Sequence, residues 1–141
     1  MPNSELYNRI LVATDGSDGS QAAAHAGLAV AERYGGTVHA VYVLDTNTYA
    51  FEDVPRSIVG LLKESGTRAI EEIAETGREQ GIDVKTGLLR GTSSQEVLDY
   101  AERNGIDLLT LGAHGQTSET HLGSTTERVI RTARQPTLSV R

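Results

Sequence analysis

Short apolar runs alternate along the chain with longer segments in which apolar residues recur at helical spacing. Three runs are almost continuous in apolar character: "RILVAT" (residues 9–14), "TVHAVYV" (residues 37–43) and "IDLLTLG" (residues 106–112). A run of this kind is typical of a strand that is covered on both faces, as in a parallel sheet. The alternating segment "DVKTGLLR" (residues 83–90) and the segment "TLSV" (residues 137–140) are expected to add two more strands.

The segment after the first run has the pattern of a helix. Alanine and valine recur there at helical spacing, at Ala22, Ala23, Ala26, Ala29 and Val30. We expect Asp18 or Ser20 to cap the start of this helix and Gly35-Gly36 to end it, because these residue types favour the two termini.

Three further helices are expected. The second spans about residues 57–80, and its apolar stripe consists of Leu61, Leu62, Ala69 and Ile73. The third lies in "TSSQEVLDYAERNG", where it begins at a hydroxyl cap and ends at Gly105. Its inward-pointing residues are expected to be Val97, Leu98 and Ala101. The fourth spans residues 123–134 and cannot continue past Pro136. Its inward-pointing residues are expected to be Thr126, Val129, Ile130 and Ala133. Strands that alternate with helices in this way predict an α/β domain over residues 1–141, with a parallel sheet between two helical layers.

The composition excludes several classes of protein. The 141 residues carry a formal net charge of −6 and no cluster of Lys and Arg, which argues against sequence-independent binding to nucleic acid. Cysteine is absent, so disulfides and thiolate chemistry are excluded and a cytoplasmic location is expected. The start "MPNSELYNR" lacks the apolar core of a secretory signal, and no apolar run reaches the ~18 residues of a membrane span. We therefore expect neither a nucleic acid nor a membrane as a partner.

Two of the expected strand-to-helix turns are rich in glycine, "TDGSDGS" after the first strand and "GAHGQTSETHLGS" after the fourth. In an open parallel sheet, ligands bind beyond the carboxyl ends of the strands, where the strand order reverses. A helix that starts at Gly123 would point N–H groups at such a ligand, and a helix N-terminus attracts phosphate above all. Ser124, Thr125 and Thr126 add hydroxyl donors. The Walker and G-x-G-x-x-G motifs are absent, and glycine in such a loop can also serve only to turn the chain.

These segments together resemble the universal stress protein family. The likeness is carried by "ILVATDGSDGS", by "HAVYVLD" and, most specifically, by "LLTLGAHG" with "GSTTERVIRTARQPTLSV". It covers essentially the whole chain. The resemblance implies a Rossmann-like fold, similar to adenine-nucleotide hydrolases, with a five-stranded parallel sheet of order 3-2-1-4-5. It also implies a dimer and a bound ATP or other adenine nucleotide.

The resemblance also implies a set of nucleotide-binding residues at the ends of the first, second and fourth strands and at the start of the last helix. The matching positions are Ala13, Asp15, Val43, Gly112, Gly115, Gly123, Ser124 and Thr125. By analogy, the first three border the adenosine, the next two let backbone approach ribose and phosphates, and the last three donate to phosphate. ATP or AMP is the expected cofactor, with Mg²⁺ as a companion of ATP.

The chain departs from the family pattern in the loop between Gly115 and Gly123. Seven residues, "QTSETHL", stand where the family has nine, and Gln116 stands where the family often has Arg or Lys. Two fewer residues shorten the reach of a loop by up to ~7 Å. The loss of a cation weakens the hold on a triphosphate. The phosphate nearest the helix is expected to be held, and the outer phosphates to gain little.

Other polar residues leave alternatives open. Asp15 fits a turn cap or a partner for a ligand hydroxyl, and a catalytic role is disfavoured because the sequence shows no partner for a base. His114 and His121 fit either an ordered loop or a metal or phosphate contact, although two histidines without nearby cysteine are a weak metal signal. His25 and His39 are expected at surface or half-buried positions. We predict no catalytic residue and no metal site.

These observations predict a regulatory dimer that binds ATP or AMP and acts in stress response or signalling. The dimer is expected to form through the final strand, where Leu138 and Val140 alternate with Thr137 and Ser139, because an unpaired sheet edge invites a second chain. One alternative is a relative that binds no nucleotide and acts through protein partners, which the short loop favours. A second alternative is a slow ATP hydrolase, for which the sequence supplies no Walker lysine and no base.

Overall fold

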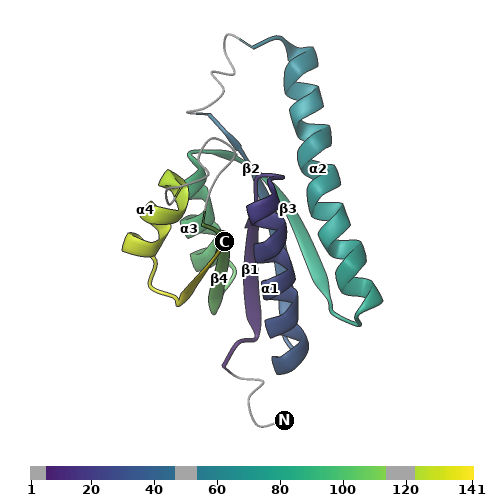
Figure 1. The fold of residues 1–141 in the computed structure, drawn as a ribbon. Coiled ribbons are helices and arrows are strands. Elements are labelled where there is room, and N and C mark those ends of the chain that lie inside the picture. The colour runs from purple at the N-terminus through teal and green to yellow at the C-terminus, as the bar shows by residue number, and fades with distance from the viewer. Residues whose placement is uncertain (1–5, 47–53, 114–122) are drawn as a thin grey trace.

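The computed structural model describes residues 6–46, 54–113 and 123–141. Helices and strands alternate along these residues, as Figure 1 shows. The strands are β1 (Arg9–Thr14), β2 (Thr37–Asp45), β3 (Val84–Gly91), β4 (Leu108–Gly112) and β5 (Thr137–Val140). The helices are α1 (Asp18–Tyr34), α2 (Arg56–Glu79), α3 (Ser93–Arg103) and α4 (Ser124–Thr132).

The five strands form one parallel sheet of order β3-β2-β1-β4-β5, which confirms the predicted fold class and strand order. β1 lies at the centre, with Ala13 paired to Val41 of β2 and to Leu111 of β4. Because the connections run to one side of β1 through α1 and α2 and then to the other side through α3 and α4, the strand order reverses between β1 and β4.

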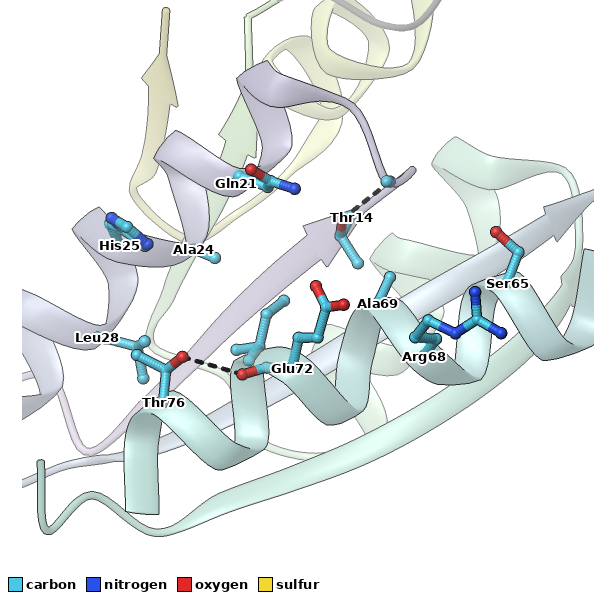
Figure 2. Close-up of a pocket in the computed structure, with 12 residues that line it drawn as sticks. Thr14, Gln21, Ala24, His25, Leu28, Ser65, Arg68, Ala69, Glu72 and Thr76 are labelled. Atoms are coloured by element: carbon cyan, nitrogen blue, oxygen red, sulfur yellow. Dashed lines mark hydrogen bonds between the residues drawn. The ribbon is translucent and has the colours of Figure 1, made fainter. Parts of the chain in front are cut away.

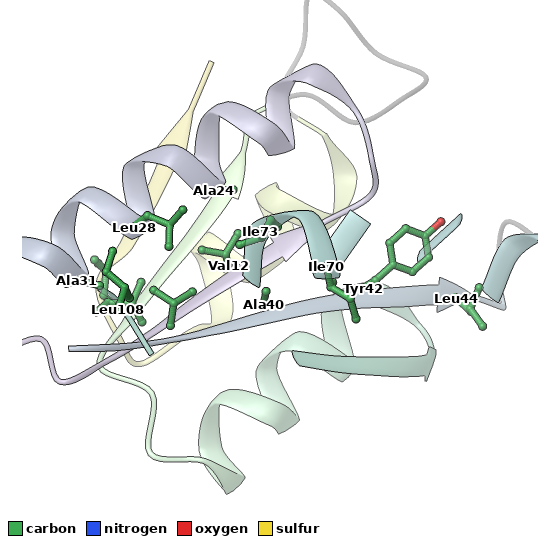
Figure 3. Packing of buried hydrophobic residues seen from close by; sticks show 13 residues of the cluster. Val12, Ala24, Leu28, Ala31, Ala40, Tyr42, Leu44, Ile70, Ile73 and Leu108 are labelled. Carbon is green, nitrogen blue, oxygen red and sulfur yellow. The ribbon is translucent and has the colours of Figure 1, made fainter. Parts of the chain in front are cut away.

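Each face of the sheet has its own apolar core. Side chains from α1 and α2 pack against one face, around Val12, Leu28 and Ile73 (Figure 3). Side chains from α3 and α4 pack against the other face, around Leu11 and Val97. Successive β1 residues thus point into different cores, which is why this strand is apolar at almost every position.

The cap of helix α1 is Ser17, which precedes the two predicted caps, Asp18 and Ser20, by one and three residues. Ser17 has extended backbone angles, and its side chain accepts a hydrogen bond from the Ser20 N–H at 3.4 Å. The buried side also differs from the predicted stripe, since it consists of Ser20, Ala23, Ala24, Gly27, Leu28 and Ala31. Gly35 ends the helix in the left-handed conformation, as expected.

Three of the four residues predicted for the apolar stripe of α2 face the sheet: Ile73 is buried, and Leu62 and Ala69 are partly buried against the same core, whereas the prediction for Leu61 is wrong. Leu61 is 60% exposed. The buried positions are Gly66, Ile70, Ile73, Ala74 and Gly77. A Cβ on Gly66 would lie 2.5 Å from the Tyr42 ring, so the glycine that weakens this helix locally is what lets the helix approach the sheet.

Helix α4 buries Thr126 and Val129, as predicted, and Ala133, its C-cap, is partly buried against the same core, whereas the prediction for Ile130 is wrong because this residue is 44% exposed. The helix is nine residues long and lies at the sheet edge beside β5, so a single buried stripe suffices to attach it. Within the described ranges, no helix is both long and apolar enough to cross a membrane.

His39 is buried, with 5% of its surface exposed, contrary to the prediction of a surface or half-buried position. Its Nδ1 lies 2.7 Å from the Tyr100 hydroxyl of α3, and the two rings meet edge to face. Burial is the main cause that lowers the pKa of His39, and the nearby Lys85 and Arg9 cations lower this pKa further. A histidine in a strand is buried here because a tyrosine 61 residues away supplies its polar partner.

Candidate functional site

The turn between β1 and α1 is held by its own polar side chains. The Thr14 hydroxyl accepts the Gly16 N–H at 3.0 Å and lies 2.8 Å from the Ser20 hydroxyl. The Asp15 carboxylate accepts the Ser17 N–H at 2.9 Å, so its predicted capping role is confirmed. Gly16 has a φ of 83°, a conformation that favours glycine. This turn therefore has a fixed shape before any ligand binds.

Helix α4 begins at the same rim of the sheet, but it is anchored differently. Gly123 is the N-cap, and no side chain makes a capping hydrogen bond there. The Gly123 N–H donates to the Ala113 carbonyl at 2.7 Å, and the Thr126 hydroxyl donates to the Gly112 carbonyl at 2.7 Å. These bonds attach the first turn of α4 to the end of β4.

The anchoring of α4 decides which of its groups can meet a phosphate. The Gly123 N–H and the Thr126 hydroxyl already donate hydrogen bonds within the protein. The Thr126 hydroxyl, which the sequence suggested as a phosphate donor, is therefore occupied. Ser124 is exposed and Thr125 is half-buried. The N–H groups in the first turn of a helix have no acceptor within the helix, so Ser124 and Thr125 supply the donors that point out of the sheet rim.

Gly112 has a packing role that the sequence did not reveal. A Cβ at this position would lie 2.8 Å from the carbonyl carbon of Gly19 and 3.0 Å from the Ser20 nitrogen. The end of β4 therefore passes directly against the backbone of the first turn of α1. Glycine is required here by the protein itself, whether or not a ligand also approaches.

Ala13 and Val43 lie on the α3 and α4 side of the sheet, where both are partly buried against the same core. Ala13 pairs with Val41, so Val43 is the next residue along β2 that points to this face. Asp15 follows β1 two residues after Ala13. The structure thus places these three predicted adenosine contacts at the carboxyl ends of two neighbouring strands.

The remaining predicted site residue, Gly115, lies outside the described residues, as do His114, Gln116 and His121. The structure also places at this rim a residue that the sequence interpretation passed over. The Asp45 carboxylate accepts the Ser93 hydroxyl at 2.6 Å, which joins the end of β2 to the start of α3. The available signal was an aspartate directly after a buried strand, the same signal that pointed to Asp15.

The charges at the rim differ from one side to the other. Asp15 and Asp18 place negative charge at the start of α1, whereas the start of α4 carries the neutral residues Gly123, Ser124 and Thr125 before its first acid, Glu127. An anion is therefore favoured on the α4 side, and uncharged groups on the β1 side. Within the described ranges, no group of three or more His, Cys, Asp or Glu side chains is placed to hold a metal ion.

Comparison with known proteins gives consistent results. Residues 6–141 match the model of the universal stress protein family. Universal stress protein MJ0531 of Methanocaldococcus jannaschii is 35% identical over 141 aligned residues, which span 96% of this chain and 83% of that protein. The solved structure of universal stress protein UspA from Lactobacillus plantarum has a TM-score of 0.81 at 29% identity and covers 96% of this chain and 98% of that one.

A more distant solved structure contains a nucleotide. The universal stress protein from Archaeoglobus fulgidus in complex with dAMP has a TM-score of 0.72 and 19% identity, and covers 96% of this chain and 99% of that one. At this level of identity the likeness extends to the fold.

Proposed function

The chain belongs to the universal stress protein family, and from this premise we propose that it is a regulatory protein that binds an adenine nucleotide, ATP or AMP. One observation carries the proposal. An uncapped helix N-terminus with exposed donors, at Ser124 and Thr125, starts at the point where the strand order reverses. This is where open α/β sheets bind phosphorylated ligands.

The proposed roles divide the nucleotide between the two sides of the rim. Ser124 and Thr125 donate to the phosphate nearest the protein, and Asp15 accepts from a ribose hydroxyl while it also accepts the Ser17 N–H. Ala13 and Val43 form an apolar border for the adenine. The neutral start of α4 and the acidic start of α1 favour this orientation over the reverse.

The glycines in this proposal act through the backbone. Gly112 keeps β4 close to α1, and through its carbonyl it also anchors Thr126 in the first turn of α4. Gly115 and the N-cap Gly123 permit close approach of the loop to the phosphates, by analogy with the family. Support for an adenine nucleotide as the ligand comes from the relative that binds dAMP. A bound Mg²⁺ is proposed only together with ATP.

The decisive experiment identifies the molecule that the purified protein carries. The protein is denatured, and the released small molecules are separated and identified by mass spectrometry. We expect an adenine nucleotide. If none is released, and if titration calorimetry of the refolded or nucleotide-free protein shows no heat with AMP or ATP, the proposal is wrong.

A second candidate function is favoured by the loop of seven residues between Gly115 and Gly123. A family member with too short a loop to hold nucleotide would act through protein partners alone. The calorimetric titration separates the two candidates, since a partner-only protein gives no signal with any adenine nucleotide.

Dimerisation is part of the proposal. β5 is an edge strand, and Leu138 on it is 39% exposed. Pairing of two β5 strands around a two-fold axis would cover both edges. A role in stress response or signalling follows from family membership, and the absence of cysteine suits the reducing cytoplasm that we propose as its location.

A further inference from the structure

Helices α1 and α2 cover the same face of the sheet, yet a groove separates them. Its volume is about 380 Å³, and it runs to the end of β1 at Thr14 and Gly16 (Figure 2). Small and aliphatic side chains form its floor: Ala24, Leu28, Ala69 and Ile73. The groove thus combines an apolar base with walls that carry polar and charged groups.

The α2 wall of the groove carries one cation and one anion, Arg68 and Glu72. They stand four residues apart, a spacing that commonly gives an ion pair on a helix. Among the described residues, neither of these two side chains has an ion-pair or side-chain hydrogen-bond partner. Figure 2 shows the Arg68 guanidinium directed along α2 toward Ser65, away from the Glu72 carboxylate. Two opposite charges beside one apolar floor are therefore both available to a ligand.

We propose that this groove binds a free aliphatic α-amino acid, represented by L-leucine. The ligand's carboxylate pairs with Arg68, its ammonium group pairs with Glu72, and its side chain lies on the apolar floor. Gln21 and His25 on the α1 wall supply further hydrogen-bonding groups.

Charge and size both favour this class of ligand. A simple anion would be repelled by Glu72, and a simple cation by Arg68, whereas a zwitterion satisfies both. A volume of about 380 Å³ lies near the lower end of the ~300–1,000 Å³ found for small-molecule sites, which suits a ligand of this size. The aliphatic floor favours a branched hydrocarbon side chain over a polar one.

The groove lies on the α1 and α2 face, whereas Ala13 and Val43 lie on the opposite face. Amino-acid binding can thus be tested on protein without nucleotide, and its outcome does not depend on the proposed function. The two sites share the β1–α1 turn, because Thr14 and Gly16 line the groove and Asp15 stands between them.

The test is titration calorimetry of the whole protein with L-leucine, leucinamide and N-acetyl-L-leucine. Saturable binding of L-leucine is expected, and either modified ligand should bind about tenfold more weakly because it has lost one charged hydrogen-bonding group. Arg68→Gln should weaken the binding of L-leucine to a similar extent but leave the binding of leucinamide, which has no carboxylate, unchanged. Glu72→Gln should weaken the binding of L-leucine but leave the binding of N-acetyl-L-leucine, which has no ammonium group, unchanged.

Matched controls lie on the same helix outside the groove lining. Lys63→Gln and Glu64→Gln remove the same charges from exposed positions of α2, so they should leave L-leucine binding unchanged. All four variants change exposed side chains, so circular dichroism and thermal unfolding should match those of the wild type.

Three results would each overturn the proposal. One is the absence of binding at millimolar L-leucine, and another is equal loss in the groove variants and in the controls. The third is that AMP displaces L-leucine and that Arg68→Gln weakens AMP binding as much as L-leucine binding, because the groove would then be part of the nucleotide site.

Discussion

Helices α1 and α4 both begin at the rim where we propose that the ligand binds, and their first turns are built in opposite ways. The start of α1 is closed by the protein's own side chains, since Ser17 caps the helix, Asp15 accepts the Ser17 N–H, and Thr14 joins Ser20. The start of α4 has glycine at the cap and no side-chain cap. Protein groups thus satisfy one helix end, while donors at the other remain for a ligand.

This difference separates stability from binding. Removal of a cap on α1 should cost folding free energy, whereas removal of a donor on α4 should cost ligand affinity. A substitution at Gly112 should affect both stability and affinity, because Gly112 contacts α1 and its carbonyl anchors Thr126 of α4.

The largest effect is expected from Gly112→Val. The new Cβ would meet the Gly19 backbone at 2.8 Å, and backbone cannot move aside as a side chain can. The free energy of unfolding should fall by about 3 kcal/mol, measured by urea denaturation, and nucleotide affinity should fall with it. Gly60→Ala is the control, because a Cβ there meets no atom within 4 Å, and this variant should be slightly more stable. Native stability in Gly112→Val would mean that β4 and α1 are not in contact.

Ser124→Ala should leave stability unchanged and weaken nucleotide binding. The exposed Ser124 side chain makes no capping hydrogen bond, so its loss costs the fold little. The loss of one hydrogen bond to a charged phosphate corresponds to about 1.5–3 kcal/mol in binding free energy. Calorimetric titration with AMP measures this loss, and a variant that binds AMP as well as the wild type would remove Ser124 from the proposed site.

Much of this fold could be predicted from the sequence, because the signals are local. Apolar runs, helical spacing and the glycines at Gly35 and Gly105 give the order of elements, and the resemblance to the family gives the strand order. The buried face of a helix was harder to predict, as Leu61 and Ile130 show, because it depends on which part of the helix reaches the sheet.

The placement of the candidate site residues at one rim of the sheet was predictable, but their hydrogen bonds were not. Ser17, Asp18 and Ser20 are all capable caps, and only the backbone angles in the structure identify Ser17. The Thr126 hydroxyl bonds to a carbonyl 14 residues earlier, and His39 bonds to a tyrosine 61 residues later. Contacts at such separations leave no periodic trace in the sequence.

The preference for ATP over AMP should be small, at most about tenfold, which corresponds to ~1.4 kcal/mol. In the proposed site the start of α4 holds one phosphate, the loop is two residues shorter than the family pattern, and Gln116 adds no cation for the outer phosphates. Titration with both nucleotides, with and without Mg²⁺, measures the gap. Insertion of two residues after Gln116 together with Gln116→Arg should widen it, while a wild-type preference of a hundredfold would contradict this account of the loop.

Ser17→Ala should show the reverse of Ser124→Ala. It removes the side-chain cap of α1 and should lower the free energy of unfolding by about 1 kcal/mol, as typical caps do. AMP affinity should be unchanged under conditions where the variant is folded. A loss of affinity as large as that in Ser124→Ala would show that both helix ends bind the ligand.

The smallest effect is a pH dependence that arises away from both helix starts. His39 lies near the amino end of β2, whereas the site lies at the carboxyl ends of the strands, and burial lowers the His39 pKa below that of an unfolded histidine, about 6.5. The unfolded chain therefore binds a proton at this residue more readily than the native protein does. The contribution of His39 to stability is fully present above pH ~6.5, declines as the pH falls below that value, and levels off below the native pKa. Urea denaturation across this range should show that decline in the wild type and in His25→Gln, which retains His39, but not in His39→Gln. AMP affinity should not follow the His39 titration. An affinity that did follow it would show that protonation of His39 is coupled to ligand binding at the start of α4.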